Sequence, residues 1–385
     1  MRVILAPDSF KGSLSAVEVC QAMNEGIRRV ISTVEIVSVP MADGGEGTVD
    51  SMVAATGGRI IQCTVTGPLG NPVTAFWGML GDGKTAVIEM AAASGILLVP
   101  QMRRDPSITT TYGTGELIMA ALNGGCEQII IGIGGSATND GGAGMAQAIG
   151  YRLLDRNGCE IQRGGAALKN LDRIDVSSVD PRITSAKIMV ACDVVNVLTG
   201  PEGAATVYGP QKGATPAMIC ELDQALNHFS GVVARDLGVE ILKLPGGGAA
   251  GGLGAGLAAF ANGKLQRGVE IVIDTVKLTE KLVDADLVLT GEGRIDGQTI
   301  NGKTPWGVAK EAKKIGLPVF AVAGGLGPGV EAVFDQIDGI MPIIDKPMSL
   351  EDAICNARIL VTEATERLMR IYLAGKQDEY ILHKQ

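Results

Sequence analysis

The sequence predicts an α/β fold with a mostly parallel, doubly wound sheet. Three patterns support this prediction. Short apolar segments alternate with helical patterns at both ends of the chain, and glycine-rich polar loops follow the apolar segments. Residues 58–99 instead alternate between apolar and polar positions and carry the turn signals GPLGNP and GDGK, which is typical of antiparallel strands. Because 385 residues exceed one ordinary core, two lobes are expected.

The N-terminal segment reads as a strand, a loop and a helix. Residues 3–6 are apolar and end in the loop PDSFKG. Ser15 and Glu18 have the spacing of a capping box, which predicts a helix over residues 16–30. A second unit repeats the order, with a strand at 35–39, the loop ADGGEG and a helix from residue 48. Since open α/β sheets bind ligands at the carboxyl ends of their strands, the polar candidates in these loops are Asp8, Ser9, Lys11 and Asp43.

The most hydrophobic short segment of the chain is followed by its most polar glycine-rich loop. Residues 129–131 are three isoleucines, which suit a strand covered on both faces. The loop GIGGSATNDGGAG follows at 132–144, ahead of a helix predicted over AGMAQAIGYRLL. Glycine amides at a helix start favour an anion site. The candidates to donate to oxyanions here are Gly134, Gly135, Ser136, Thr138 and Asn139.

The remaining elements set the predicted domain limits. Residues 1–57 and 281–385 are assigned to a Rossmann-like or flavodoxin-like lobe that is split in sequence, and residues 58–280 to an inserted second α/β lobe. Residues 105–198 are a candidate addition to the first lobe, because we expect the strands at 129–133 and 187–191 to join the N-terminal sheet. A single amphipathic helix is predicted over 350–373.

Composition excludes several classes of function. A net charge of −9 argues against nucleic-acid binding, which needs a basic field. No run approaches the roughly 18 apolar residues of a membrane span, and the first residues lack a signal-peptide core. The seven cysteines are scattered without a CxxC pair, so we expect reduced thiols, a cytoplasmic location, no disulfide and no structural zinc. Two histidines leave little room for a histidine triad.

One motif match is treated as accidental. Residues 297–304, GQTINGKT, satisfy the Walker A pattern, whose lysine and threonine would bind phosphate and magnesium. A P-loop begins where its strand ends, whereas here the predicted strand ends near Thr290 and GEGRID intervenes. Lys303 remains a candidate for a phosphate contact, just ahead of a helix expected from Pro305, a residue that suits the first helical position.

Eight motifs occur in order along nearly the whole chain. They are APDSFKGSLSA (6–16), ADGGEGT (42–48), GTGEL (113–117), GIGGSATNDGGAG (132–144), ACDVVN (191–196), GPQKG (209–213), GAAGG (248–252) and TGEGRIDGQTINGKTP (290–305). Together they resemble the bacterial two-lobed glycerate kinases, the glycerate 2-kinase family. The resemblance implies transfer of the ATP γ-phosphate to D-glycerate, giving 2-phosphoglycerate and ADP, with Mg²⁺ as cofactor. The same kinase giving 3-phosphoglycerate is the alternative.

Hypotheses for the site follow from this implied chemistry, which requires positioning and charge neutralisation. Lys11, Lys212 and Lys303 are candidates to neutralise phosphates, and Arg294 to clamp the glycerate carboxylate. Asp193 and Asp296 are candidates for general base and metal ligand, in either order. Catalytic roles are assigned to Asp193, Lys11 and Asp296, cofactor binding to Gly134, Gly135, Ser136, Thr138, Asn139, Gly291, Glu292 and Lys303, and substrate binding to Asp8, Ser9, Asp43, Arg294 and Lys212.

Each hypothesis has a simpler alternative. The lysines could be solvated surface residues, and the aspartates could cap helices or form turns. A nicotinamide dehydrogenase would need GxGxxG after the first strand, where this chain has PDSFKG. A two-lobed binding protein that closes on a small acid would explain the glycine-rich segments, but it should be secreted. The expected partners are D-glycerate and ATP, with no nucleic acid or membrane, in a monomer or a homodimer.

Overall fold

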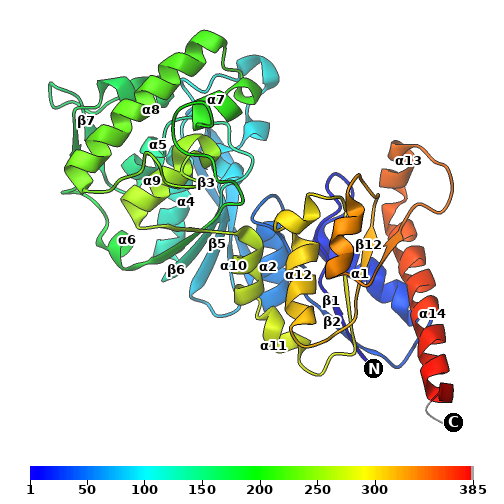
Figure 1. Ribbon diagram of the computed structural model, residues 1–385. Coiled ribbons are helices and arrows are strands. Elements are labelled where there is room, and N and C mark those ends of the chain that lie inside the picture. Colours follow the sequence, from blue (N-terminus) through cyan, green and yellow to red (C-terminus); the bar gives the residue numbers. More distant parts are fainter. Residues whose placement is uncertain (383–385) are drawn as a thin grey trace. The chain divides into compact units, whose positions relative to one another are not determined.

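The computed structural model describes residues 1–382 of the chain. The chain divides into two compact units, which we call unit 1 and unit 2. Unit 1 comprises Met1–Asp43, Asp50–Ala55 and Val269–Gln385, and unit 2 comprises Gly44–Val49 and Thr56–Gly268. Figure 1 labels their helices and strands.

Unit 1 is built on a five-stranded sheet in which every neighbouring pair of strands is parallel. The spatial order is β13-β12-β11-β1-β2. The strands are β1 (Arg2–Leu5), β2 (Glu35–Ser38), β11 (Leu287–Glu292), β12 (Val319–Ala323) and β13 (Gly339–Pro342). The chain leaves β1 in one direction towards β2 and later extends in the other from β11 to β13. A doubly wound sheet that begins at the N-terminus and is completed near the C-terminus is therefore confirmed.

Helices cover this sheet and bury its apolar strands. They are α1 (Ala16–Arg28), α2 (Thr48–Thr56), α10 (Gly268–Thr275), α11 (Leu278–Leu282), η6 (Thr299–Asn301), α12 (Thr304–Lys313), η7 (Val330–Asp335), α13 (Leu350–Cys355) and α14 (Ala357–Leu382). The capping box of α1 is confirmed, because the Ser15 side chain accepts from the Glu18 amide and the Glu18 carboxylate accepts from the Ser15 amide. α1 and α14 lie side by side (Figure 1). They share a buried cluster of apolar side chains with β1 and β11.

Two predicted helix limits differ in unit 1. The helix expected over 350–373 is divided, because α13 ends at Cys355 and α14 then runs from Ala357 to Leu382. α12 begins at Thr304, so Pro305 occupies the second helical position instead of the first. Proline is tolerated there because the amides of the first turn have no partner within the helix.

Unit 2 is built on a six-stranded mixed sheet with the order β10-β9-β6-β5-β4-β3. Its strands are β3 (Arg59–Thr66), β4 (Pro72–Met79), β5 (Thr85–Glu89), β6 (Gln128–Gly132), β9 (Lys187–Ala191) and β10 (Lys264–Gln266). β3, β4 and β5 pair antiparallel, as the alternation of residues 58–99 predicts. The other pairs are parallel. A separate two-stranded sheet holds β7 (Arg152–Leu154) and β8 (Arg173–Asp175).

The expected placement of two strands in the N-terminal sheet is wrong. β6 pairs with β5 on one side and with β9 on the other, so residues 128–132 and 187–191 belong to the sheet of unit 2. The buried isoleucines of β6 suit a central parallel position in either sheet. Strand composition alone therefore could not distinguish the two, and long-range hydrogen bonding decided it.

The helices of unit 2 are mostly short. They are α3 (Ala91–Ser94), η1 (Ile96–Leu98), η2 (Gln101–Arg103), α4 (Tyr112–Asn123), α5 (Ala143–Ala148), η3 (Gly165–Asn170), α6 (Pro181–Ser185), α7 (Ala204–Tyr208), η4 (Pro210–Lys212), α8 (Pro216–Leu237), η5 (Ala249–Gly252) and α9 (Leu253–Ala261). The helix predicted over AGMAQAIGYRLL ends at Ala148, and its last three residues form β7. Gly150 turns the chain with φ +104°, and a Cβ there would lie 2.2 Å from the Ser178 carbonyl oxygen.

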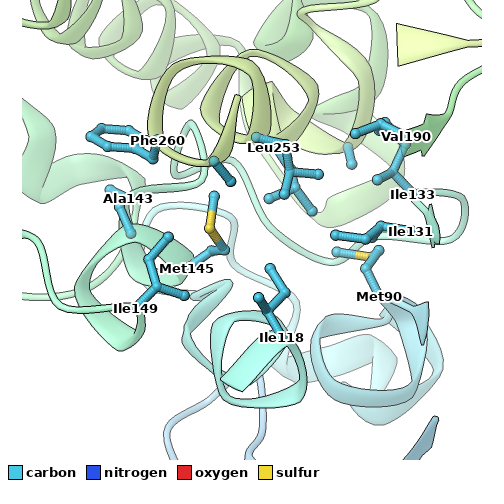
Figure 2. Packing of buried hydrophobic residues seen from close by; sticks show 14 of the residues in the cluster. Met90, Ile118, Ile131, Ile133, Ala143, Met145, Ile149, Val190, Leu253 and Phe260 are labelled. Carbon is cyan, nitrogen blue, oxygen red and sulfur yellow. The ribbon is translucent and has the colours of Figure 1, made fainter. Parts of the chain in front are cut away.

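The core of unit 2 lies between β6 and the surrounding helices. Figure 2 shows Ile131 of β6 and Ile118 of α4 in the same packed group as Leu253 and Phe260 of α9. All four side chains are buried. Among residues 1–382, no helix combines the length and the apolar character that crossing a bilayer requires.

The contact between α1 and α14 predicts an unusual response to alanine. A Cβ added to Gly26 in α1 would lie 2.3 Å from the Thr362 carbonyl oxygen of α14. Gly26→Ala should therefore destabilise unit 1 by about 1–3 kcal/mol in urea unfolding, through overpacking. Glycine to alanine in an open helix instead stabilises by up to about 1 kcal/mol.

Gly231 of α8 is the matched control, because a Cβ there would meet no atom within 4 Å. Gly231→Ala should leave stability unchanged or raise it. Equal stabilisation by both substitutions would show that the helices α1 and α14 separate easily.

Candidate functional site

A buried carboxylate links the first loop of unit 1 to the start of α12. Asp8 follows β1, and its Oδ1 accepts from the Ser9 amide at 2.6 Å. Its Oδ2 accepts from the Thr304 hydroxyl at 2.6 Å. Burial raises the pKa of Asp8 to about 6, the nearby charge of Asp43 adds to this shift, and the Thr304 hydrogen bond opposes it. Asp8 is thus a partly protonated group at the edge of the sheet near neutral pH.

A second buried carboxylate lies at the end of β11. Glu292 accepts from the Thr299 hydroxyl at 2.8 Å, and its Oε1 is 3.6 Å from Lys303 Nζ. Burial raises the pKa of Glu292 to about 7; the Lys303 charge opposes this shift, and the Asp8 charge adds to it more weakly. The two carboxylates therefore influence each other. Carboxyls with raised pKa values in one place are typical of functional sites.

Cations accompany these carboxylates. Lys303 Nζ lies 3.7 Å from Asp296 Oδ1 as well as near Glu292, and Arg294 Nε lies 3.4 Å from Asp296 Oδ2. Lys11 Nζ lies 3.9 Å from Asp43 Oδ2. Lys11 and Arg294 keep most of their side chains exposed, so both can turn towards an anion. We call Asp8, Asp43, Glu292, Arg294, Asp296, Lys303 and Lys11 the unit 1 cluster.

Asp296 also stabilises a turn, which is one of the simpler roles that the sequence analysis gave as alternatives for the aspartates. The Gln298 amide donates to its Oδ1 at 3.0 Å, which is the hydrogen bond of an Asx turn. β11 ends at Glu292, and four residues separate it from Gly297. The apparent Walker A segment consequently lacks the strand-to-loop junction of a P-loop, and its lysine faces carboxylates.

Lys212 lies in the interior of unit 2. Its Nζ donates to Ser136 Oγ at 2.7 Å and to the Thr138 carbonyl oxygen at 2.7 Å. Only 1% of the residue is exposed, so the alternative of a solvated surface lysine is wrong. Burial lowers the pKa of Lys212 to about 7, and the Asp140 charge opposes this shift. The lysine ties the 209–213 segment to the glycine-rich loop.

The predicted anion site in the glycine-rich loop is partly filled by the chain itself. The Asp140 carboxylate accepts from the amides of Gly142 and Gly144, at 3.2 and 3.3 Å, and from the amide and hydroxyl of Thr111. Burial raises the pKa of Asp140, and these hydrogen bonds oppose the shift. The sequence suggests that these two glycine amides are open to a ligand. In the structure they already donate hydrogen bonds to Asp140. Asp140 lies in the quoted motif among the polar side chains of the loop, but it received no role in the site assignments.

Two neighbours of Asp140 keep polar atoms without partners. Thr138 and Asn139 are fully buried. Within the described part of the chain, Thr138 Oγ1 and both amide atoms of Asn139 make no hydrogen bond. Gly134 and Gly135 lie nearby in the same loop, and a Cβ on Gly134 would be 3.6 Å from the Gly45 Cα. The loop therefore combines tight backbone packing with buried polar groups.

Asp193 follows β9 and belongs to unit 2, whereas Asp296 belongs to unit 1. Asp193 is exposed, and its Oδ1 accepts from the Gly268 amide at 3.0 Å.

Sequence reasoning missed Thr299 and Thr304 as site residues. Both lie in the TGEGRIDGQTINGKTP motif, and Thr304 also stands at the threonine position of the apparent Walker A match. In the structure, Thr299 donates a hydrogen bond to Glu292 and Thr304 donates one to Asp8.

Comparison with known proteins decides the family. A sequence model described as "Glycerate kinase family" matches residues 3–373. The chain belongs to the glycerate kinase family. It is accordingly a kinase, and the resemblance carried by the eight motifs is confirmed.

Individual relatives match along almost their full length. A glycerate kinase from Halalkalibacterium halodurans is 55% identical over 95% of this chain and 97% of its own. A glycerate 2-kinase from Escherichia coli strain K12 is 53% identical over 98% of this chain and 100% of its own. The crystal structure of a protein described as glycerate kinase 2, from Salmonella typhimurium LT2, superimposes with a TM-score of 0.91 at 53% identity, covering 98% and 99% of the two chains.

The buried lysine of this family member predicts a pH-dependent stability. Because the Lys212 pKa falls from 10.5 to about 7 on folding, the unfolded chain binds more protons between these values. Stability should therefore rise with pH across that window. In urea unfolding, the wild-type free energy of unfolding should gain up to about 1.4 kcal/mol per pH unit relative to Lys212→Met.

Lys169→Met, at an exposed lysine of the same unit, is the control and should keep the wild-type pH slope. Identical slopes for the wild type and Lys212→Met would mean that Lys212 stays protonated when buried.

Proposed function

We propose that the protein is an ATP-dependent glycerate kinase that phosphorylates D-glycerate, giving 2-phosphoglycerate and ADP. The observation that carries this proposal is the match to the relative named glycerate 2-kinase over nearly the whole of both chains. Similarity of this extent supports the same substrate and the same phosphorylated hydroxyl. The unit 1 cluster supports it independently, because phosphoryl transfer depends on charge neutralisation and positioning.

In this proposal, cationic side chains and hydroxyl groups of the protein bind the phosphate and carboxylate groups of the reactants. Lys11 and Lys303 neutralise phosphate oxygens, and Arg294 supplies a planar fork for a phosphate or a carboxylate. Gly291, Ser9 and Asp43 line the same carboxyl edge of the unit 1 sheet. In unit 2, Lys212 holds Ser136 and the Thr138 backbone in place, so that Ser136, Thr138 and Asn139 remain the proposed polar contacts of that loop.

In this proposal, one carboxylate accepts the proton of the attacking hydroxyl, and another binds the metal cation. Asp193 and Asp296 remain the proposed general base and metal ligand, with their order open to test. Asp8 and Glu292 carry raised pKa values, so either could hold a proton near neutral pH. An ionised carboxylate beside the attacking hydroxyl would accept its proton as the hydroxyl oxygen bonds to the γ-phosphorus and the bond from that phosphorus to the bridging oxygen breaks, releasing ADP.

Magnesium is proposed as the companion of ATP. No group of three or more His, Cys, Asp or Glu side chains within residues that the structure describes is arranged to hold a metal ion. Magnesium usually needs only one or two carboxylates together with substrate phosphates. Asp8 and Asp43 lie close enough to each other to contribute beside Asp193 or Asp296, because the nearby negative charge of Asp43 adds to burial, the larger cause, in raising the pKa of Asp8. When bound, magnesium would neutralise phosphate charge.

A cytoplasmic location is also proposed. All seven cysteines are free thiols, which favours a reducing compartment.

The direct test is to incubate the purified protein with D-glycerate and magnesium-ATP and to identify the product by phosphorus NMR. A 2-phosphoglycerate signal is expected. A 3-phosphoglycerate signal would keep the kinase and refute the proposed position. Intact ATP with D-glycerate, L-glycerate and related hydroxy acids would refute the proposed activity.

The role of Lys11 predicts a loss of activity without a loss of fold. Lys11→Ala should lower kcat/KM by about 10²-fold or more, because a phosphate-neutralising cation is lost. The melting temperature should hardly change, since the lysine is exposed and its ion pair with Asp43 is weak.

Lys84→Ala is the matched control. Lys84 is a similarly exposed lysine with one acidic partner, Glu127 at 3.6 Å, and it lies outside the unit 1 cluster. Its substitution should leave kcat/KM and the melting temperature unchanged. An equal effect of both substitutions would remove Lys11 from the site.

A further inference from the structure

A pocket of about 610 Å³ opens at the carboxyl edge of the unit 1 sheet. Loops that follow β1, β11, β12 and β13 form its walls together with α13. Its lining is chiefly apolar, with two cations among the side chains. The lining includes Phe10, Leu326, Leu350, Ile354, Lys11 and Arg294.

The pocket includes the point where the strand order reverses. β1 and β11 are neighbours in the sheet, but the chain proceeds from them in opposite directions. In open α/β sheets, ligands bind in the crevice outside the carboxyl ends of the strands at such a point. Phe10 and Lys11 come after β1, and Gly293 and Arg294 come after β11, so the pocket is lined from both sides of this crevice.

The apolar lining indicates which of the two reactants, glycerate or ATP, the pocket binds. Glycerate has three carbons and a polar group on each, so it cannot cover several apolar side chains. Leu326, Leu350 and Ile354 keep 46%, 76% and 40% of their surfaces exposed, which leaves apolar area for a ligand to bury. A volume of this size matches drug-sized or nucleotide-sized ligands, which bind apolar walls with few polar contacts.

We propose that this pocket holds the base and ribose of ATP, with the phosphates extending past Lys11 and Arg294. The proposal rests on the proposed kinase function and adds the location of the nucleoside within unit 1. It also reassigns Arg294 from the glycerate carboxylate to a phosphate. The sequence analysis assigned cofactor binding partly to the 132–144 loop of unit 2, as an anion site, and there Asp140 already occupies two amides.

The two cations connect the pocket to the carboxylates. Lys11 pairs with Asp43, and Arg294 pairs with Asp296. A phosphate chain that leaves the pocket along these cations would therefore reach the unit 1 cluster. Gly327 leaves room for this arrangement, because a Cβ there would lie 2.8 Å from Arg294 Nε and 2.7 Å from Asp296 Cβ.

The test measures nucleotide binding without turnover. Isothermal titration with ADP, in the absence of glycerate, should show binding to the wild type and at least about tenfold weaker binding to Ile354→Asp, which puts a charge against the base. Ile359→Asp is the matched control, because Ile359 is an exposed isoleucine of α14 outside the pocket lining. It should bind ADP like the wild type.

Competition experiments separate the two ends of the nucleotide. Adenosine should lose affinity in Ile354→Asp and keep it in Arg294→Gln. Tripolyphosphate should lose affinity in Arg294→Gln and keep it in Ile354→Asp. Circular dichroism melting of each variant verifies folding, and Ala353→Trp, which fills the pocket, provides a second obstruction if Ile354→Asp melts early.

The outcomes are distinct. ADP binding that is equal in the wild type and Ile354→Asp, or absent from the wild type, overturns the proposal. A raised KM for glycerate with unchanged ADP binding also overturns it, because the pocket would then hold glycerate. Wild-type protein that binds ADP but does not phosphorylate glycerate refutes the proposed function, while the effect of Ile354→Asp on ADP still decides the pocket.

Discussion

The hydrogen bond from Thr304 to the buried Asp8 joins parts of the chain that lie 296 positions apart, and it connects the first loop of unit 1 to the start of α12. Asp8 follows β1, whereas Thr304 begins α12 after β11. The parallel pairing of β1 with β11 brings these two loops to the same edge of the sheet. Burying an ionisable side chain without partners costs free energy. Burial raises the pKa of Asp8, and its two hydrogen bonds offset part of that shift.

Buried ionisable groups occur in both units, but their surroundings differ. Asp8 and Glu292 lie near other carboxylates and near cations that are partly exposed, an arrangement that can respond to a charged ligand. Asp140 instead receives four hydrogen bonds from its own loop and from Thr111, which is an arrangement of a structural group. Since buried charge is weak evidence for stability, the first group is better explained by function.

The glycine-rich loops serve packing as well as chemistry. A Cβ on Gly132 would lie 2.3 Å from the Gly44 carbonyl oxygen, and one on Gly251 would lie 1.9 Å from that of Thr138. These loops lie too close together to admit side chains. Glycine motifs of this kind therefore do not by themselves locate a phosphate, and three apolar residues that line the pocket near α13, Leu326, Leu350 and Ile354, lie outside the eight motifs.

The sequence by itself determined the elements whose signals are local. The capping box at Ser15 and the antiparallel pattern of residues 58–99 depend on hydrogen bonds between near neighbours, so both could be predicted. The eight motifs determined the family because they occur in order along the chain. The tertiary structure alone decided that β6 and β9 pair in unit 2, that Lys212 is buried and that Asp140 occupies the amides of its loop. These features depend on contacts between residues distant in sequence, and a strand, lysine or amide of the same composition can satisfy its hydrogen bonds with many such partners.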